Sequence, residues 1–160
     1  MHEPQRLVME FHLKHGHPLP QHPVQMSPQS IMLRKRLMEE ELGELVEAMW
    51  AGDMVKVADG LADLLVVTYG TAIAAGIDME PIFREVHFSN MTNDVGPQDS
   101  GGKILKGPSF KQPELGPILS EQSADLTVYS KYIRGLLMLR VVRPPASLPI
   151  YTRTAPEAGV

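Results

Sequence analysis

The sequence predicts an all-α protein, an antiparallel bundle of helices. Residues 29–96 contain only one of the chain's 14 prolines, so long helices can form there without interruption. Within this region, residues that cap helix starts stand before apolar runs, and glycines that end helices stand after them. The connections between the runs are very short, which favours antiparallel neighbours. These features together predict three consecutive helices and no substantial sheet.

The first helix is predicted at Glu3–Lys14, and a proline-rich loop follows it. The second helix begins at Ser27 and Pro28, because this pair is an N-cap followed by proline at the first helical position. It ends at about Ala51, because Gly52 follows and glycine commonly ends helices.

Two aspartates mark the starts of the next helices. Asp53 can cap a third helix that runs to Gly76, and Asp78 can cap a fourth that ends near Met91. The third helix is apolar nearly all round, and such a helix is normally buried. We therefore expect a second copy of the chain to complete the bundle in a homo-oligomer, most simply a homodimer.

The rest of the chain divides into an arm and a tail. Residues 92–119 are rich in Gly, Pro and Lys, which predicts an ordered arm without regular structure. We assign residues 1–119 to one helical domain and residues 120–160 to a poorly defined tail. Leu136–Val142 could form a short helix or strand within this tail, which indicates no function of its own.

The composition excludes several classes of protein. With a net charge of −4, the chain lacks the basic surface that duplex nucleic acid requires. It has no cysteine, which rules out disulfides and thiolate metal sites. The apolar stretch from Leu61 to Ile77 is interrupted by Asp63 and is too polar for a membrane span, and the chain shows no signal-peptide pattern. We therefore expect a cytoplasmic protein without a membrane partner.

Acidic side chains gather on the second and third helices. Glu40, Glu44 and Glu47 fall within about 60° of arc, and few cations relieve their mutual repulsion. The otherwise apolar third helix carries Asp59 and Asp63 one turn apart, where burial would require a cation or a shifted pKa. Facing carboxylates of this kind suit Mg²⁺, which prefers oxygen ligands.

On these two helices alone, a structural alternative stays open. Lys56, Arg34 or Arg36 could neutralise the two aspartates in ion pairs without any metal ion. From the rotation of about 100° per residue, we expect both aspartates to face the glutamates and Gly60 to point elsewhere.

Several segments, in order, resemble one known family. Glu40-Glu41-x-x-Glu44 and the segment ADGLADLLVVTYGTA resemble the metal-binding motifs of the MazG-like all-alpha nucleoside triphosphate pyrophosphohydrolases. FHLKHG with its proline-rich loop, REVHFSNMTND and GGKILKGPSFKQPEL extend the resemblance over residues 7–119. The superfamily also includes the phosphoribosyl-ATP pyrophosphohydrolases and the dimeric dUTPases. The resemblance implies an all-α MazG-like bundle.

The chain departs from the family signature at one position. The signature is EExxE followed by ExxD on the next helix, and these groups hold Mg²⁺. Asp63 matches the final Asp, but Gly60 occupies the Glu position, and Asp59 could take over its role. Many relatives also have a lysine after the SNM segment, where this chain has Asn93.

The resemblance implies hydrolysis of a nucleoside triphosphate to the monophosphate and pyrophosphate. Mg²⁺, with Mn²⁺ as a substitute, would be held by Glu41, Glu44, Asp63 and Asp59. Glu40 or Glu44 would orient or deprotonate the attacking water, whose pKa the metal ion lowers. The expected substrate is a deoxynucleotide, specifically a pyrimidine nucleotide such as dUTP. The expected role is house-cleaning, the removal of unwanted nucleotides.

Four further residues are candidates for substrate binding: Asn90, His87, Lys103 and Lys106. The amide of Asn90 should face inward, and a core amide bonded to the backbone is the alternative. As a lone histidine, His87 is favoured as a structural residue over a ligand, and lysines in such an arm are usually solvated unless they close over a polyphosphate. Zinc binding by the histidines of residues 12–22 is not favoured, since the proline-rich loop fixes no ligand geometry.

Two alternatives to nucleoside triphosphate hydrolysis stay open. The first is the phosphoribosyl-ATP pyrophosphohydrolase of histidine biosynthesis, which uses equivalent chemistry on a different substrate. The second is a catalytically silent helical interaction module, because Gly60 replaces a glutamate of the motif.

Overall fold

The described part of the structure, a computed structural model, comprises residues 1–94, 96, 98–125 and 133–135. Its long helices are α1 (Glu3–Lys14), α2 (Pro28–Ala51), α3 (Met54–Ala74), α4 (Met79–Met91) and α5 (Leu115–Ala124). Apart from an isolated bridge between Gln98 and Ile104, the regular structure of these residues is helical. The predicted all-α fold class is confirmed. The suggested helix or strand at Leu136–Val142 lies outside the described residues.

Side-chain capping explains where three of the helices begin. Ser27, Asp53 and Asp78 each accept a hydrogen bond from a backbone N–H group in the first turn of the helix that follows. Such caps satisfy donors that no helical carbonyl can reach, and each is worth about 1 kcal/mol. Gly52 ends α2 in the left-handed conformation, with a φ of 68°. The predicted starts of α2, α3 and α4 are confirmed.

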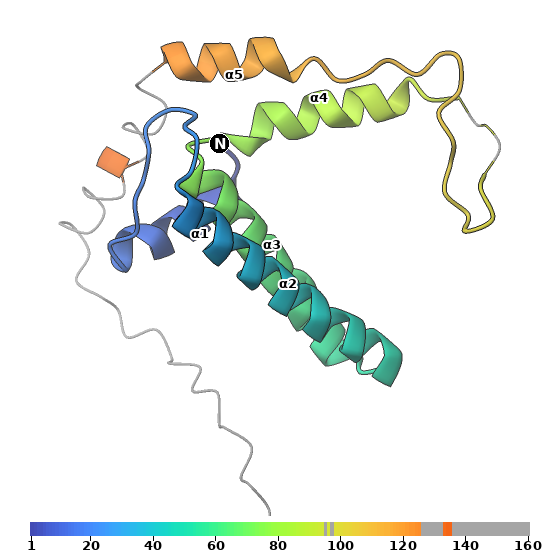
Figure 1. The fold of residues 1–160 in the computed structure, drawn as a ribbon, viewed down its shortest axis with the longest axis horizontal. Helices are drawn as coiled ribbons and strands as arrows, with labels where there is room; N and C mark the ends of the chain where they lie inside the picture. Colours follow the sequence, from blue (N-terminus) through green and yellow to red (C-terminus); the bar gives the residue numbers. More distant parts are fainter. Residues whose placement is uncertain (95, 97, 126–132, 136–160) are drawn as a thin grey trace, which may run out of the picture.

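The helices α2 and α3 form a long antiparallel hairpin, and α1 packs against α3 (Figure 1). The buried core at this crossing contains Val8 and Met9 of α1 and Ile73 of α3. Farther along the hairpin, α3 approaches α2 closely at Gly60. A Cβ atom at this position would lie 3.1 Å from both the Cα and the Cβ of Leu45. Glycine therefore permits an approach of the two helices that any side chain would resist.

The helix α4 does not continue the bundle. It turns away from the hairpin and packs mainly against α5, which runs back alongside it (Figure 1). The expectation that the three helices of residues 28–91 are antiparallel neighbours is therefore wrong for α4. Gly76 makes the corner with a φ of 69°, directly against the backbone carbonyl of His22, where no Cβ atom has room.

The helix α5 is not predicted by the sequence. Gly116 and Pro117 argue against a helix, but both fall in its first turn, where a proline costs no helical hydrogen bond. Because α5 includes residues 119 and 120, regular structure continues across the point at which the sequence analysis separates the domain from the tail.

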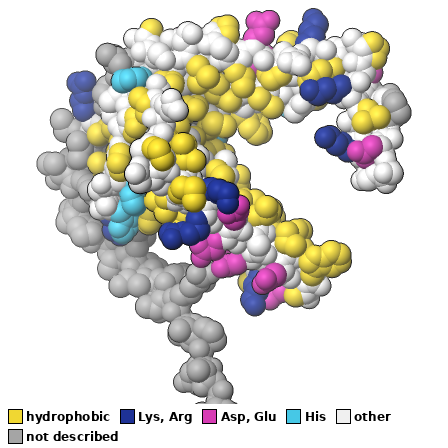
Figure 2. Space-filling view, in the orientation of Figure 1, with side chains coloured by type: hydrophobic (Ala, Val, Ile, Leu, Met, Phe, Trp, Pro, Cys, Tyr) yellow, Lys and Arg dark blue, Asp and Glu magenta, His cyan; other side chains and the backbone are white. Residues whose placement is uncertain are grey.

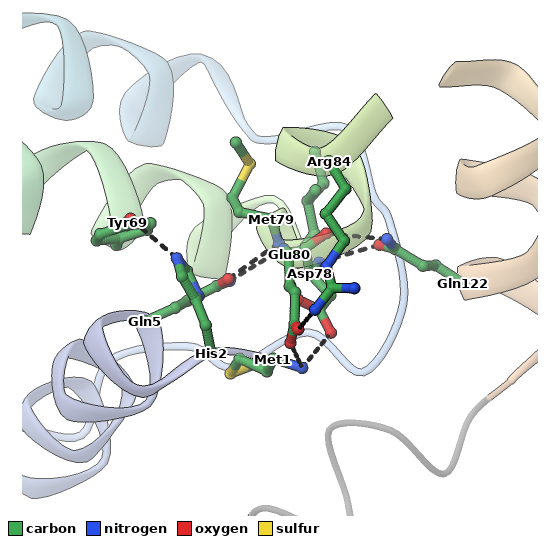
Figure 3. A network of polar contacts seen from close by, with 10 residues as sticks. Met1, His2, Gln5, Tyr69, Asp78, Met79, Glu80, Arg84 and Gln122 are labelled. Atoms are coloured by element: carbon green, nitrogen blue, oxygen red, sulfur yellow. Dashed lines mark hydrogen bonds and ion pairs between the residues drawn. The ribbon is translucent and has the colours of Figure 1, made fainter. Parts of the chain in front are cut away.

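A polar network joins α1 to the corner between α3 and α4 (Figure 3). The fully buried amide of Gln5 donates to the carbonyl of Ile77 and accepts from the N–H of Met79. Gln122 of α5 makes the same two kinds of bond with the backbone of Asp78. Because buried backbone groups are costly to leave unpaired, the two glutamines hold α1, the corner and α5 together.

Much of the apolar surface of the hairpin stays exposed in a single chain. Trp50, at the end of α2, is 88% exposed. Other exposed apolar side chains of the hairpin are Ile31, Leu42, Val46, Met49, Val55, Leu61, Leu65 and Val66. Figure 2 shows hydrophobic side chains gathered at the hairpin tip. One chain therefore leaves its most apolar helix, α3, partly uncovered.

By length and composition alone, α3 could cross a membrane, with a mean hydropathy of 1.4. This is weak evidence, because core helices of soluble proteins pass the same test. Within the chain, 28% of the apolar window is buried. The helix carries two carboxylates, Asp59 and Asp63, and moving such groups into the hydrocarbon core of a bilayer costs free energy.

The contact at Gly60 predicts opposite effects for two glycine-to-alanine substitutions. Gly43→Ala should stabilise the fold by about 1 kcal/mol, because alanine is the better helix former, and no other atom lies within 4 Å of its new Cβ. Gly60→Ala gains the same propensity but must displace the backbone of Leu45, so it should lower the free energy of unfolding by about 1 kcal/mol. Chemical denaturation followed by circular dichroism measures both. Equal stabilisation by the two variants would contradict the close contact.

Candidate functional site

The register of the α2–α3 hairpin determines which site residues can meet. One contact joins Gly60 to Leu45, and a second joins Gly70 to Arg34, whose Nη1 would lie 3.0 Å from a Cβ atom on residue 70. In an antiparallel pair, equal steps toward the tip on both helices keep facing residues level with each other. The Gly60–Leu45 contact reaches the backbone of α2 and therefore sets the register, and the Arg34–Gly70 contact is consistent with it.

Glu41 and Asp63 lie level with each other across the hairpin. Glu41 is seven residues after Arg34, and Asp63 is seven residues before Gly70. Seven residues make nearly two helical turns, so both carboxylates occupy the faces that make the Arg34–Gly70 contact. Both residues are half-buried. They are therefore the predicted ligands that the hairpin best brings together.

The glycine that replaces the motif glutamate faces α2. Gly60 is buried against Leu45, the residue after Glu44, whereas Asp59 is exposed. The prediction that residue 60 points away from α2 is therefore wrong. The physical reason is the close approach of the helices, which requires the smallest residue of this turn at the contact.

The predicted catalytic carboxylates, Glu40 and Glu44, are exposed on α2. Throughout the described ranges, no three His, Asp or Glu side chains lie close enough together to hold a metal ion. The donors nevertheless suit Mg²⁺, which is commonly held by one or two carboxylates together with waters and substrate phosphates. Glu41 and Asp63 can supply such a pair, and Glu44 lies one turn from Glu41.

The alternative of structural ion pairs is not found among the described residues. There, the aspartates of α3 form no ion pair with Lys56, Arg34 or Arg36. Lys35 pairs with Glu39 at 2.7 Å, an exposed i,i+4 pair that contributes little. Within the described ranges, the carboxylates of α3 are therefore not committed to a cationic side chain.

The residues predicted to bind substrate on α4 lie away from the carboxylates. Asn90 and His87 are both exposed, so the expectation of an inward-facing Asn90 amide is wrong. Ser89 is buried instead and donates to the carbonyl of Lys111. The inward face differs from the predicted one because α4 packs against the arm and α5 instead of against the hairpin.

The two lysines of the arm that were predicted to bind substrate, Lys103 and Lys106, are exposed. Lys106 Nζ lies 4.2 Å from the ring centroid of Phe110. Asn93 accepts a hydrogen bond from the N–H of Gly107 and donates one to the carbonyl of Leu105, so it organises the arm. Figure 1 shows α4 and the arm projecting from the hairpin. A single chain therefore does not bring these lysines to the carboxylates.

A basic cluster in the hairpin was missed by the sequence analysis. His12 of α1 and Arg34 of α2 meet over Gly70 of α3. Burial, together with the positive charge of Arg34 and the nearby His17, lowers the pKa of His12 to about 4. The sequence does contain one signal for this cluster, because Arg34 precedes Glu41 by seven residues and Gly70 follows Asp63 by seven residues. The two spacings can be related to each other only when the register of the hairpin is known.

A known family matches the part of the chain that spans α1 to α4. Residues 8–90, about half of the chain, match the family model for phosphoribosyl-ATP pyrophosphohydrolase. The chain belongs to the phosphoribosyl-ATP pyrophosphohydrolase family. By its name, this family contains hydrolases that act on a phosphoric acid anhydride. The resemblance to the MazG-like superfamily is thereby confirmed.

A viral protein is similar to part of the chain. It is an uncharacterized protein of Acanthamoeba polyphaga mimivirus, 36% identical over 77 residues. The aligned segment covers 46% of this chain and 31% of that relative. The chain therefore matches about a third of the viral protein, which has no described activity.

The buried histidine predicts a pH-dependent stability. His12 has a pKa of about 4 in the folded chain, against an ordinary value of 6.5. As the pH falls from 6.5 toward 4, the unfolded chain binds a proton that the folded chain does not. The free energy of unfolding should therefore fall by up to about 3 kcal/mol across this window. Thermal unfolding at a series of pH values measures this slope.

His12→Gln should flatten that slope, because glutamine binds no proton. His87→Gln changes an exposed residue of α4 and is the matched control. Its stability curve should overlay that of the parent protein. An unchanged slope in His12→Gln would contradict a buried, neutral His12.

Proposed function

We propose that this protein is a metal-dependent nucleotide pyrophosphohydrolase, which splits its substrate into a nucleoside monophosphate and pyrophosphate. Family membership supports this class of reaction. The proposal rests mainly on Glu41 and Asp63, which lie opposite each other on α2 and α3. Two carboxylates in such positions can hold a cation between them. A protein with a net charge of −4 needs such a cation to attract a polyphosphate.

The carboxylates divide between two roles. Glu41, Asp63 and the adjacent Glu44 would hold Mg²⁺ or Mn²⁺, with Asp59 as a fourth ligand in place of the motif glutamate. A bound ion neutralises phosphate charge and lowers the pKa of a coordinated water. Glu40 or Glu44 orients or deprotonates the attacking water, and both are open to solvent.

The proposed substrate-binding residues come from α4 and the arm. They are Asn90, His87, Lys103 and Lys106, all of them exposed. In one chain they project from the hairpin, so a complete site needs an arm to lie over a hairpin. The lysines would then add positive charge opposite the carboxylates, where the substrate phosphates bind.

Two substrate classes fit the proposed site. A nucleoside triphosphate, with a pyrimidine deoxynucleotide such as dUTP foremost, is favoured by the dUTPase-like segments of the sequence. Phosphoribosyl-ATP is favoured by the family model that matches residues 8–90. The chemistry is the same in both cases, because water breaks the anhydride between the α and β phosphates. The base and sugar determine which substrate binds.

A substrate panel tests the proposed reaction. With Mg²⁺, the protein should release pyrophosphate from dUTP, from another nucleoside triphosphate or from phosphoribosyl-ATP, and EDTA should abolish the release because all predicted ligands are oxygen donors. Release of orthophosphate would indicate attack at the terminal phosphate. No turnover with any member of the panel would contradict the proposal and favour a silent interaction module.

Variants of the acidic residues identify the metal ligands. Asp63→Asn should lower the rate by about 100-fold or more, because it removes a half-buried ligand. Asp59→Asn should lower it comparably if Asp59 replaces the motif glutamate. Glu47→Gln, on the exposed side of α2, is the control and should leave the rate unchanged. Parent-like activity of Asp63→Asn would contradict the assigned metal site.

We also propose that the active form is a homodimer. The exposed apolar side chains of α2 and α3 flank the carboxylate pair, and a second hairpin packed on them would complete a four-helix bundle. In such a dimer, the arm of one chain could cover the hairpin of the other. The separation of lysines and carboxylates within one chain supports this arrangement.

Light scattering at micromolar concentration should report about twice the chain mass of 17.7 kDa. Leu65→Lys places a charge on the exposed face of α3 and should dissociate the dimer, because a buried unpaired charge is costly. Phe83→Lys makes the same kind of change on α4 and should leave the mass unchanged. A parent protein that is monomeric would count against the dimer.

A further inference from the structure

We propose that His12, Arg34 and Gly70 form a binding site for a phosphate group, separate from the carboxylate pair. The three residues come from α1, α2 and α3 and meet where α1 packs against the hairpin. A phosphate group fits this chemistry, because its oxygens can accept hydrogen bonds from a guanidinium and an imidazole together.

Gly70 creates the space in which the two basic side chains converge. A Cβ atom on residue 70 would lie 3.0 Å from Nη1 of Arg34 and 3.2 Å from Nε2 of His12. Both side-chain tips therefore reach the same point on α3. Any larger residue there would displace at least one of them, so the shape of the site depends on glycine.

Both basic groups are withdrawn from solvent, and among the described residues no ion pair accounts for the burial of Arg34. His12 is only 3% exposed, and its Nδ1 is buried without a hydrogen-bond partner. Burial lowers the pKa of Arg34, which forms no ion pair within the part of the chain that the structure describes. Because partly buried charges are normally paired, an anion beside Nη1 of Arg34 and Nε2 of His12 supplies the pairing that Arg34 lacks among the described residues.

A second histidine ring lies next to His12, and a third lies on the same end of α1. The His17 ring centroid lies 5.1 Å from that of His12, and His15 lies 4.3 Å from Phe11 on the same helix end. Arg34 on α2 and His17 in the loop after α1 are the charged or titratable groups that shift the pKa of His12. The α3 helix contributes a glycine at this point. The local environment therefore favours an anion over a cation.

The basic cluster lies on the same faces of the hairpin as the carboxylate pair. Seven residues separate Arg34 from Glu41, which is about 10 Å along a helix axis. A ligand longer than this could contact both levels, with one phosphate on the basic cluster and another on a metal ion. The phosphate site is inferred from its own contacts and does not depend on the proposed hydrolysis.

Calorimetric titration with inorganic phosphate and pyrophosphate tests the site. The titration is done in EDTA, so that no metal ion on the carboxylates contributes to binding. The parent protein should bind pyrophosphate, and Arg34→Gln should bind it about tenfold more weakly or worse, because a charge-assisted hydrogen bond is lost. Arg36→Gln changes an exposed arginine of the same helix and should bind like the parent.

Gly70→Ala is a second variant that keeps both basic side chains. Alanine favours helix, so the far-UV circular dichroism should be unchanged, while the new Cβ atom displaces Arg34 and weakens pyrophosphate binding. NMR titration gives a further readout: pyrophosphate should raise the pKa of His12 in the parent but not in Arg34→Gln. A histidine that only fills the core would not respond.

Two further measurements distinguish the source of the phosphate group. If it belongs to the substrate, Arg34→Gln should raise the KM for that nucleotide with little change in kcat. If the ligand is inorganic phosphate or pyrophosphate itself, the KM should stay unchanged while binding of the free anion is lost. Hydrolysis that fails in the parent while pyrophosphate still binds would contradict the proposed function and leave this site intact.

The proposal is overturned by either of two results. One is parent protein that binds neither phosphate nor pyrophosphate at millimolar concentration. The other is equal pyrophosphate affinity in the parent, Arg34→Gln and Gly70→Ala.

Discussion

The close contact between α2 and α3 at Gly60 is the constraint on which the site depends. It brings the helices near enough for Leu45 to fill the space that a side chain would need, and it thereby sets their antiparallel register. That register makes Glu41 level with Asp63 and sets Arg34 over Gly70. Gly60, which stands where the motif of the resembling family has a glutamate, is therefore also the residue that lets the two helices pack.

The hairpin carries acidic and basic groups at different levels. The carboxylate pair lies toward the tip, and the basic cluster of His12 and Arg34 lies about two turns away, beneath α1. A polyanion can approach such a surface only if its phosphates meet positive charge, either a metal ion on the carboxylates or the basic cluster directly. Among the residues that the structure describes, Arg34 forms no ion pair with the aspartates of α3, so the basic cluster and these aspartates stay separate.

A single chain does not assemble all of the site. The lysines of the arm and the exposed residues of α4 project from the hairpin, while the apolar sides of α2 and α3 remain partly uncovered. Both features have one physical explanation if a second chain packs on the hairpin, because that contact would bury the apolar sides and could supply the arm. The direction in which α4 leaves the hairpin is set by Gln5 and Gln122. Their hydrogen bonds join the backbone of the α3–α4 corner to α1 and α5.

The sequence by itself determined the starts of α2, α3 and α4, because Ser27, Asp53 and Asp78 cap the first turn through bonds to residues only two or three positions away. It also indicated the family, since the carboxylate motif is local in sequence. Only the tertiary structure decided that α4 leaves the bundle, that α5 exists, that residue 60 faces α2 and that His12 meets Arg34. These features depend on contacts between segments far apart in the chain, where packing outweighs local preference and no periodic pattern records the partner.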